Sequence, residues 1–417
     1  MSFLFECTEC KKHYLPGEVL YLCPACSAGA ASMEPLRGLL RCVYDSGAIS
    51  RLLTREALRL RNGSTFARYI EIFPIESAES VPPLMAGATP LRPAVNLRRA
   101  LGHDGVWVKD DTTQPTASFK DRASALVVAA AREGDRDTIV TASTGNAATA
   151  LAGQAASVGA KSVIFVPQSA PAAKLAQIAV FGSMLVPVKG TYDEAFELSI
   201  AACEEFGWYN RNTAYNPFTV EGKKGAALEI WEQMGCASPD WVVVPTGDGV
   251  ILAGIEKGFA DLVALGLADR VPKLAAVQAE GCCPIYRAWE KGSLEIEPER
   301  KPRTIADSIS VGVPRAGRLV MRALSSCGGA CAAVSDEEIL DAIVLLGNTT
   351  GVFAEPAAAA AIAGLKKLID SGTIRRDESA VALVTGSGLK DVSAASRAVT
   401  IPKAIEPTLQ ALKKLIG

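Results

Sequence analysis

Short apolar runs alternate with amphipathic stretches through the middle of the chain, and this alternation limits the fold more than any other feature. The predicted elements are a strand at 138–142, a helix at 146–158, a strand at 162–167, a helix at 172–180 and a strand at 184–188. The two helices end at Gly159 and Gly182. Apolar strands separated by amphipathic helices are typical of parallel strands that are covered on both faces. The sequence therefore predicts an α/β fold.

A second series of the same kind follows. It contains strands at 241–245, 274–278 and 380–384 and a helix from about 249 to 265. In doubly wound sheets, ligands collect at the carboxyl ends of the strands, where loops meet helix N-termini. The polar motifs of this chain follow predicted strands or begin helices, so we expect them to share one site.

Lys120 follows a polar loop and begins a predicted helix that ends near Gly134. The helix dipole disfavours an ammonium group in the first turn, which lowers the lysine pKa and favours a nucleophilic amine. Such an amine can form a Schiff base. Taken alone, the same string also fits a surface lysine at a helix start.

Three ordered motifs resemble threonine synthase, a member of the tryptophan-synthase-β-like, fold-type II group of pyridoxal-phosphate enzymes. They are 115–122 (PTASFKDR), 142–146 (ASTGN) and 384–391 (VTGSGLKD), preceded by 87–91 (GATPL). The resemblance implies two doubly wound α/β domains with a small zinc-ribbon-like segment. Its expected parts are a zinc-ribbon-like segment at 1–34, a helical layer with the first part of the large cofactor domain at 35–130, a smaller substrate-binding α/β domain at 131–225 and the rest of the large domain at 226–417.

The resemblance also assigns residues to pyridoxal 5′-phosphate. Lys120 would carry the aldehyde, Asn146 would bond the ring oxygen, and Thr385 would face the pyridine nitrogen. A neutral hydroxyl there leaves the ring a weaker electron sink, which suits eliminations and replacements. Ser387 departs from the family, in which histidine is common at that place, and this departure bears on the substrate.

A glycine-containing loop follows the strand at 241–245 and opens a helix, so its backbone N–H groups can cradle a phosphate. It consists of Thr246, Gly247, Asp248 and Gly249. Asp248 is a departure because a carboxylate repels a phosphate dianion, so we expect its side chain to face away. An ordinary turn would fit the same four residues.

The substrate-binding candidates fall into two groups. Ser143 and Thr144 offer hydroxyl and amide groups for a carboxylate, although a simple helix N-cap explains the same string. Side chains that could grip a second anionic group are Lys174, Asn212, Asn216, Lys223 and Lys224. The strings around Ser308 and Glu355 also resemble segments lining the cofactor cleft of the family.

Two CxxC pairs lie near the N-terminus with twelve residues between them. Cys7 and Cys10 form the first pair, and Cys23 and Cys26 form the second. Two such turns can complete a tetrahedral four-cysteine zinc site, with Tyr14 and 19–22 as a short hairpin between them. The alternative is four unligated thiols. We expect the zinc to be structural.

Charge and hydropathy exclude several partners. Lysine plus arginine number 43 against 45 for aspartate plus glutamate, a net charge of −2 that gives no field to recruit nucleic acid or an anionic membrane. The N-terminus lacks a basic region followed by an apolar run, so we expect a cytoplasmic protein. No G-x-G-x-x-G motif is present, which disfavours a nicotinamide enzyme. We expect a homodimer.

The leading functional prediction is a lyase that converts O-phosphohomoserine and water to L-threonine and phosphate. Within the same class, the alternatives are a serine/threonine dehydratase and a β-replacement enzyme acting on phosphoserine, as cysteate synthase does. The alternative outside that class is a degenerate enzyme fold that serves as a binding module.

Overall fold

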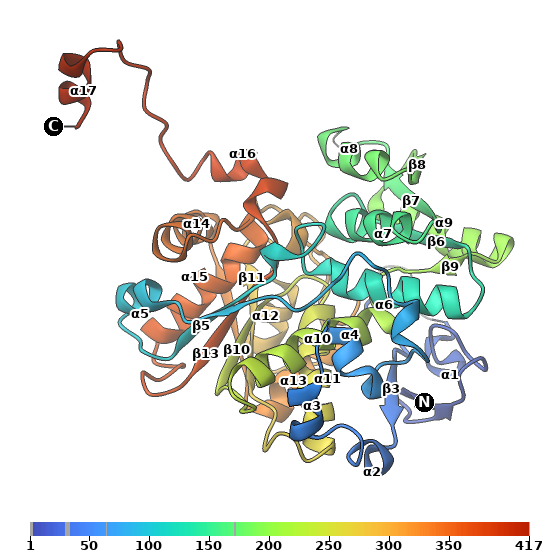
Figure 1. Cartoon of the computed structure of the whole chain (residues 1–417). Coiled ribbons are helices and arrows are strands. Elements are labelled where there is room, and N and C mark those ends of the chain that lie inside the picture. The colour runs from blue at the N-terminus through green and yellow to red at the C-terminus, as the bar shows by residue number, and fades with distance from the viewer. Residues whose placement is uncertain (1–2, 30–33, 64, 171, 417) are drawn as a thin grey trace.

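The computed structural model describes residues 3–29, 34–63, 65–170 and 172–416. Within them, two mainly parallel sheets with helices on both faces form the body of the molecule, and a small antiparallel sheet lies at the N-terminal end (Figure 1). This arrangement confirms the predicted α/β fold.

The larger sheet has six strands in the order β12-β11-β10-β13-β5-β4. They are β12 (Ala330–Val334), β11 (Lys273–Ala279), β10 (Trp241–Pro245), β13 (Ala380–Val384), β5 (Val106–Asp110) and β4 (Leu91–Arg92). All neighbouring pairs are parallel except β4 and β5. Val242 and Val244 join one core and Val243 the other, because successive side chains of a strand point to opposite faces.

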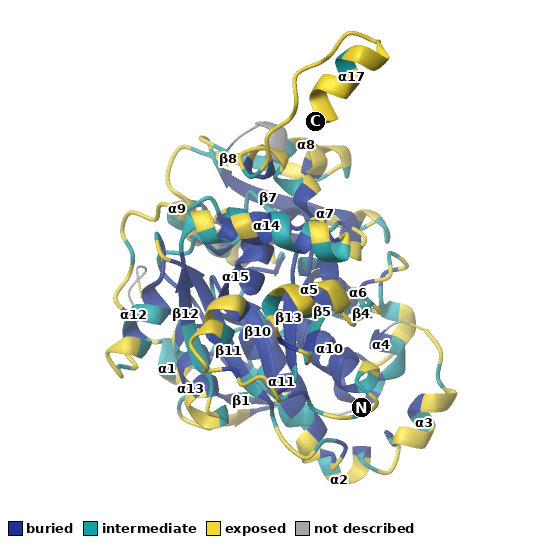
Figure 2. Ribbon diagram, turned by 90° about the vertical axis from the view of Figure 1, so that its left-hand side faces the viewer, coloured by how far each residue is buried: buried dark blue, intermediate teal, exposed yellow. Residues whose placement is uncertain are grey.

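Helices cover both faces of this sheet, and Figure 2 shows its central strands β10 and β13 as buried between them. The first core includes residues of α10 (Phe218–Gln233), α11 (Val250–Ala264), α12 (Pro284–Glu290) and α13 (Gly317–Cys327). The second includes residues of α5 (Val95–Leu101), α14 (Asp336–Thr350) and α15 (Pro356–Asp370).

The smaller sheet has four parallel strands in the order β8-β7-β6-β9. They are β8 (Met184–Val188), β7 (Lys161–Pro167), β6 (Thr138–Ala142) and β9 (Tyr209–Asn210). Its helices are α6 (Lys120–Glu133), α7 (Asn146–Ala156), α8 (Ala172–Val180) and α9 (Tyr192–Phe206). One core holds residues of α6, α7 and α8, and the other holds residues of α9.

The N-terminal sheet has the order β2-β1-β3, from β1 (Phe3–Cys7), β2 (His13–Tyr14) and β3 (Leu40–Tyr44). The predicted hairpin between Tyr14 and 19–22 is wrong, because β2 pairs with β1 instead. β3 pairs with β1 along its whole length, so this sheet extends past the expected boundary at residue 34.

The remaining elements are short. They are α1 (Pro24–Ser27), α2 (Ser46–Ile49), α3 (Arg55–Leu60), α4 (Thr65–Arg68), α16 (Val392–Ala395) and α17 (Leu409–Ile416), with 3₁₀ turns η1 (Ile70–Ile72), η2 (Ala78–Ser80), η3 (Asp111–Thr113), η4 (Asp307–Ile309) and η5 (Gly388–Lys390). Among the described residues, no helix is both long and apolar enough to cross a membrane.

Candidate active site

A cavity of about 860 Å³ opens at the carboxyl ends of β6, β10 and β13. Its lining includes Lys120 at the start of α6, Asn146 at the start of α7 and the loop that enters α11. Three helix N-termini therefore point their partial positive charge into one space, which favours anionic ligands.

Backbone pairing brings Lys120 beside Thr385. The Phe119 N–H donates to the Thr385 carbonyl oxygen at 2.8 Å, and the Ser387 N–H donates to the Ala117 carbonyl oxygen at 3.0 Å. Ala117 has a φ of 62°, so the chain turns sharply just before the helix. Lys120 and Thr385, which are far apart in sequence, thus line the same end of the cavity.

The environment of Lys120 favours its neutral amine. Burial lowers the pKa of Lys120, and the charge of Arg211 lowers this pKa further, while Glu355 and Asp248 oppose the shift. A lysine whose pKa is lowered has more free amine near neutral pH, and the free amine is the nucleophile.

A buried carboxylate holds Asn146. The Asn146 Nδ2 donates to both oxygens of Glu355, at 2.9 and 3.0 Å, and to the Ser308 hydroxyl at 3.3 Å. Burial raises the pKa of Glu355, although Asn146 and Lys120 oppose this. Glu355 therefore holds the start of α7 by hydrogen bonds and acts on the proton of Lys120 by its charge.

The loop from Thr246 to Gly249 passes very close to the wall of the cavity. A Cβ on Gly247 would lie 2.9 Å from the Ile309 Cα, and Gly249 has a φ of 88°, so both positions require glycine. α11 begins directly after this loop, and the first N–H groups of a helix have no acceptor within it. The loop can thus present several backbone donors to one anion.

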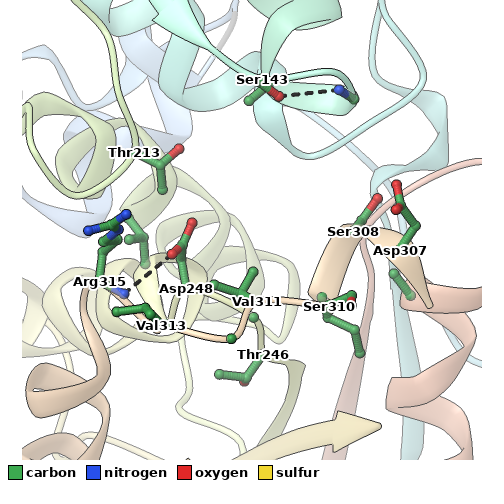
Figure 3. Close-up of a pocket in the computed structure, with 18 of the residues that line it drawn as sticks. Ser143, Thr213, Thr246, Asp248, Asp307, Ser308, Ser310, Val311, Val313 and Arg315 are labelled. Carbon is green, nitrogen blue, oxygen red and sulfur yellow. Dashed lines mark hydrogen bonds between the residues drawn. The ribbon is translucent and has the colours of Figure 1, made fainter. Parts of the chain in front are cut away.

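The prediction that the Asp248 side chain faces away from the cavity is wrong. Asp248 lines the cavity, and one of its oxygens accepts the Arg315 N–H at 3.3 Å (Figure 3). Burial raises the pKa of the Asp248 carboxyl, which Arg315, Lys223 and Lys120 oppose. The surrounding cations explain why a carboxylate is tolerated here.

Ser143 and Thr144 line the opposite side of the cavity at the end of β6. The N-cap of α7 is Gly145 and has no side-chain capping bond, so these two hydroxyls do not cap that helix. The Ser143 hydroxyl accepts the nearby Gly145 N–H at 3.2 Å (Figure 3).

Three buried cations, here called the cation wall, lie on the side of the cavity near Asp248. They are Lys223 on α10, Arg211 after β9 and Arg315 before α13. Arg315 pairs with Asp193 at 2.5 Å, and Figure 3 shows Arg315, Asp248 and Thr213 together on this side. Lys223 and Arg315 line the cavity, and Arg211 stands behind them.

Burial lowers the pKa of two members of the cation wall, Lys223 and Arg211. Burial and the charges of Arg211 and Lys120 hold the pKa of Lys223 well below its ordinary value. Burial also lowers the pKa of Arg211 to about 10, and the Arg211 Nη2 is buried without a protein partner. An anion bound here would accept a hydrogen bond from the Arg211 Nη2 and offset the repulsion that Lys223 meets from Arg211 and Lys120.

The remaining sequence candidates lie elsewhere. Asn212 and Asn216 are buried outside the cavity lining, where Asn212 accepts the Ala142 N–H at 2.8 Å and Asn216 donates to the Asn210 carbonyl oxygen at 2.8 Å. Their amides support β6 and β9, and their contact with the substrate stays a prediction. Lys224 pairs with Glu221 at 2.6 Å inside the protein. Lys174 belongs to α8, but its side chain lies outside the described residues.

Sequence reasoning missed Arg211 and Arg315. Arg211 lies inside the amide-rich string at 208–218, and only its neighbours were chosen as candidates. Arg315 follows the Ser308 string by seven residues and lacks a recognisable motif. Burial is what distinguishes these two arginines from the solvated ones, and sequence does not reveal it.

The four cysteines of the CxxC pairs lie together. The sulfur atoms of Cys7, Cys10, Cys23 and Cys26 are all within 4.8 Å of one another. Four thiolates at about 2.3 Å from one Zn²⁺ would be about 3.8 Å apart, so this cluster has a suitable size. The Tyr14 hydroxyl contacts the Cys23 sulfur at 3.0 Å and covers the cluster from one side.

Comparisons with known proteins identify the family. The model of the family described as pyridoxal-phosphate dependent enzyme matches residues 83–386. A threonine synthase of Methanocaldococcus jannaschii is 38% identical over 414 residues, which cover 99% of each chain. Those of Methanosarcina acetivorans and Mycobacterium tuberculosis are both 35% identical and cover 99% and 78% of this chain, and 98% and 88% of their own.

Solved structures share the fold. A threonine deaminase from Solanum lycopersicum superposes with a TM-score of 0.63 at 22% identity and covers 78% of this chain and 90% of its own. The maize serine racemase superposes with a TM-score of 0.62 at 23% identity and covers 72% of this chain and 88% of its own. At these identities the likeness concerns the fold.

Proposed function

Since the chain belongs to the family of pyridoxal-phosphate dependent enzymes, we propose that it is a threonine synthase that converts O-phosphohomoserine and water to L-threonine and inorganic phosphate. The observation that carries this proposal is a single cavity that is lined both by a lysine of lowered pKa and by buried cations of the cation wall. Such a cavity suits an amino acid that carries a second anion at the far end of its side chain.

The residues present fit pyridoxal phosphate. A cradle of backbone donors at 246–249 suits its phosphate, and the Lys120 amine suits its aldehyde. We propose that Asn146 bonds the ring oxygen and that Thr385 faces the pyridine nitrogen. When bound, the cofactor supplies an electron sink that lets the α-proton of an amino acid leave.

Each side chain of the site has a separate proposed role. The Lys120 amine moves protons at the α, β and γ carbons of the substrate. The hydroxyls of Ser143 and Thr144 bind and orient the substrate carboxylate. Glu355 holds Asn146 in place and lies close enough to Lys120 to influence its proton.

Lys223 and Arg315 line the wall that would hold the substrate phosphate, and Arg211 supports them from behind. Phosphate leaves from the γ carbon with an additional negative charge, and positioned cations stabilise that charge. The same cations would hold the departing phosphate while water adds at the β carbon.

Product analysis tests the proposal. The purified holoenzyme would be given O-phosphohomoserine, phosphoserine with sulfite, or threonine in separate reactions. Equal amounts of threonine and phosphate from the first substrate are expected. Cysteate from the second would indicate a β-replacement enzyme, and 2-oxobutanoate with ammonia from the third would indicate a dehydratase; either result as the main activity contradicts the proposal.

We also propose that Cys7, Cys10, Cys23 and Cys26 bind one structural Zn²⁺. The support is the close approach of their four sulfur atoms and the small size of the sheet around them. The proposed location is the cytoplasm, where reducing conditions keep thiols free.

The division of labour between the two sheets is a further part of the proposal. Residues 131–225, around the smaller sheet, would bind the substrate, and 35–130 with 226–417 would hold the cofactor. We propose a homodimer as the working form, supported by the exposed apolar residues of α17, which stands away from the body (Figure 1).

A further inference from the structure

We propose that the N-terminal module, defined as residues 3–29 and 34–44, holds the cation wall in the geometry that binds a phosphate group. Tyr21 and Tyr44 are then positioning residues for Arg211 and Lys223, because they act through the chain segments that carry those cations. The inference rests on the proposed function only for the identity of the phosphate as part of the substrate.

Tyr21 supports the segment that carries Arg211. Its hydroxyl accepts the Asn210 N–H at 2.9 Å, one residue before Arg211. Its ring stacks on Tyr215, with 4.7 Å between the centroids. Tyr21 therefore contacts the 210–215 segment on both sides of Arg211, and Thr213 of this segment lines the cavity.

Strand β3 supports the helix that carries Lys223. The Cys42 N–H donates to Glu221 at 3.2 Å, and the Tyr44 hydroxyl donates to the other oxygen of Glu221 at 2.9 Å. Glu221 also pairs with Lys224, so a buried ion pair holds the turn of α10 that contains Lys223. On the opposite side, a Cβ on Gly254 would lie 2.6 Å from the Lys223 Cβ, which leaves the helix no room to shift towards α11.

The module also contacts the segment that carries Arg315. The Leu36 N–H donates to the Arg315 carbonyl oxygen at 3.1 Å. Arg322, two turns further along α13, donates to the Thr8 carbonyl oxygen at 2.6 Å. All three cations of the wall therefore lie on segments that the module holds.

Repulsion explains why the wall needs this support. Burial and the charges of Arg211 and Lys120 hold the pKa of Lys223 well below its ordinary value, so a protonated Lys223 is repelled by these neighbours and keeps its place through the segments that carry it. Within the described part of the chain, no hydrogen bond joins the module to Lys120, Asn146 or Thr385. Loss of module contacts should thus weaken phosphate binding and leave cofactor binding intact.

The test compares Tyr21→Phe and Tyr21→Ala in the full-length holoenzyme. Binding of inorganic phosphate is measured by calorimetry, cofactor binding by absorbance, and kcat and KM with O-phosphohomoserine. Tyr21→Phe removes one hydrogen bond, so we expect about a threefold weaker affinity for phosphate, and about tenfold for Tyr21→Ala, which also removes the stacked ring. KM should rise by the same factors, while kcat and cofactor affinity stay unchanged.

Tyr69→Phe is the matched control. The Tyr69 hydroxyl donates to Glu232 at 2.6 Å and lies outside both the module and the cavity lining. The control variant loses a buried hydroxyl and some stability, yet phosphate affinity should not change. A general loss of stability is thereby separated from a loss of wall geometry.

Three results would overturn the inference. They are wild-type phosphate affinity in a folded Tyr21→Ala enzyme, a drop in cofactor affinity as large as the drop in phosphate affinity, and a wild-type holoenzyme that binds no phosphate. If the wild type binds phosphate but does not turn over O-phosphohomoserine, the proposed function fails. The predicted differences in phosphate affinity would still test the module.

Discussion

Lys120 lies where the proposed chemistry needs an amine, at the start of α6 and beside Thr385. Lys120→Ala should remove covalent attachment of the cofactor and lower kcat by about a thousandfold or more, because proton transfer by a positioned group contributes about this much. The fold should remain intact. Borohydride reduction followed by peptide mapping checks the prediction, and a pyridoxyl group found on another lysine would contradict it.

Lys223 lowers the free energy of unfolding when no anion is bound, since it is fully buried and repelled by Arg211 and Lys120. Lys223→Met should raise the free energy of unfolding by about 1 kcal/mol, because an uncompensated buried charge is removed. It should also abolish the stabilisation of the fold by added phosphate. Denaturant titration with and without phosphate measures both effects, and a less stable variant that still responds to phosphate would refute this account.

The same lysine gives stability a dependence on pH. Its folded-state pKa lies well below the unfolded value, so between the two values the unfolded chain binds more protons, and stability rises with pH. This contribution is present above the unfolded pKa and is lost as pH falls through the folded pKa. The free energy of unfolding should rise less with pH in Lys223→Met than in the wild type. Identical pH profiles of the two proteins would show that Lys223 does not cause the rise.

Thr385 is buried at the end of β13 and lines the cavity. Thr385→Ser keeps a hydroxyl, so it should change kcat and the cofactor absorbance only slightly. Thr385→Asp should protonate the pyridine nitrogen, shift the cofactor absorbance, and favour side transamination over elimination. Spectra and product ratios measure this, and a Thr385→Val enzyme with unchanged kinetics and absorbance would exclude the proposed contact.

At the scale of elements, the N-terminal sheet tests whether metal binding and cofactor binding are separate. We expect about one zinc per chain, held by the four clustered cysteines. Removal of the metal should loosen β1 to β3 and leave the cofactor bound, since the cofactor residues belong to other elements. Metal analysis with cofactor absorbance after chelation checks this, and four freely alkylated thiols in the purified protein would disagree with it.

The order of elements also shows what local patterns reveal. The strands β6, β8, β10 and β13 match their predicted limits, because buried parallel strands are continuous apolar runs. Helix α9 was not predicted, although its capping box of Thr191 and Glu194 is visible in the sequence. The predicted hairpin between Tyr14 and 19–22 was wrong because a strand of two residues has too short a pattern to indicate which strand it pairs with. In the structure it pairs with β1.

At the scale of the whole molecule, the C-terminal segment supports the proposed homodimer. Leu409, Leu412 and Leu415 are exposed on α17, which stands clear of the body on an extended segment (Figure 2). A second copy that covers this apolar face would remove it from water. A chain that ends at residue 398 should therefore sediment as a monomer, whereas the full chain should sediment as a dimer. If both chains form the same oligomer, the C-terminal segment does not hold the dimer together.

The sequence by itself determined the α/β class, most strands around the site, and the cofactor candidates Lys120, Asn146 and Thr385. Each of these depends on local patterns: hydrophobic period, glycine turns, and motifs that follow strands or begin helices. The two CxxC pairs were likewise readable, because neighbouring ligands on one turn fix their own spacing.

Only the tertiary structure decided which charged residues form the cation wall. Arg211 and Arg315 are separated by about a hundred residues, yet both lie near Tyr192 in the folded chain. The tertiary structure also placed Asp248 in the cavity lining. It placed the amides of Asn212 and Asn216 where they form hydrogen bonds with backbone groups. Burial and charge neighbourhood depend on contacts between distant segments, and those contacts exist only once the chain has folded.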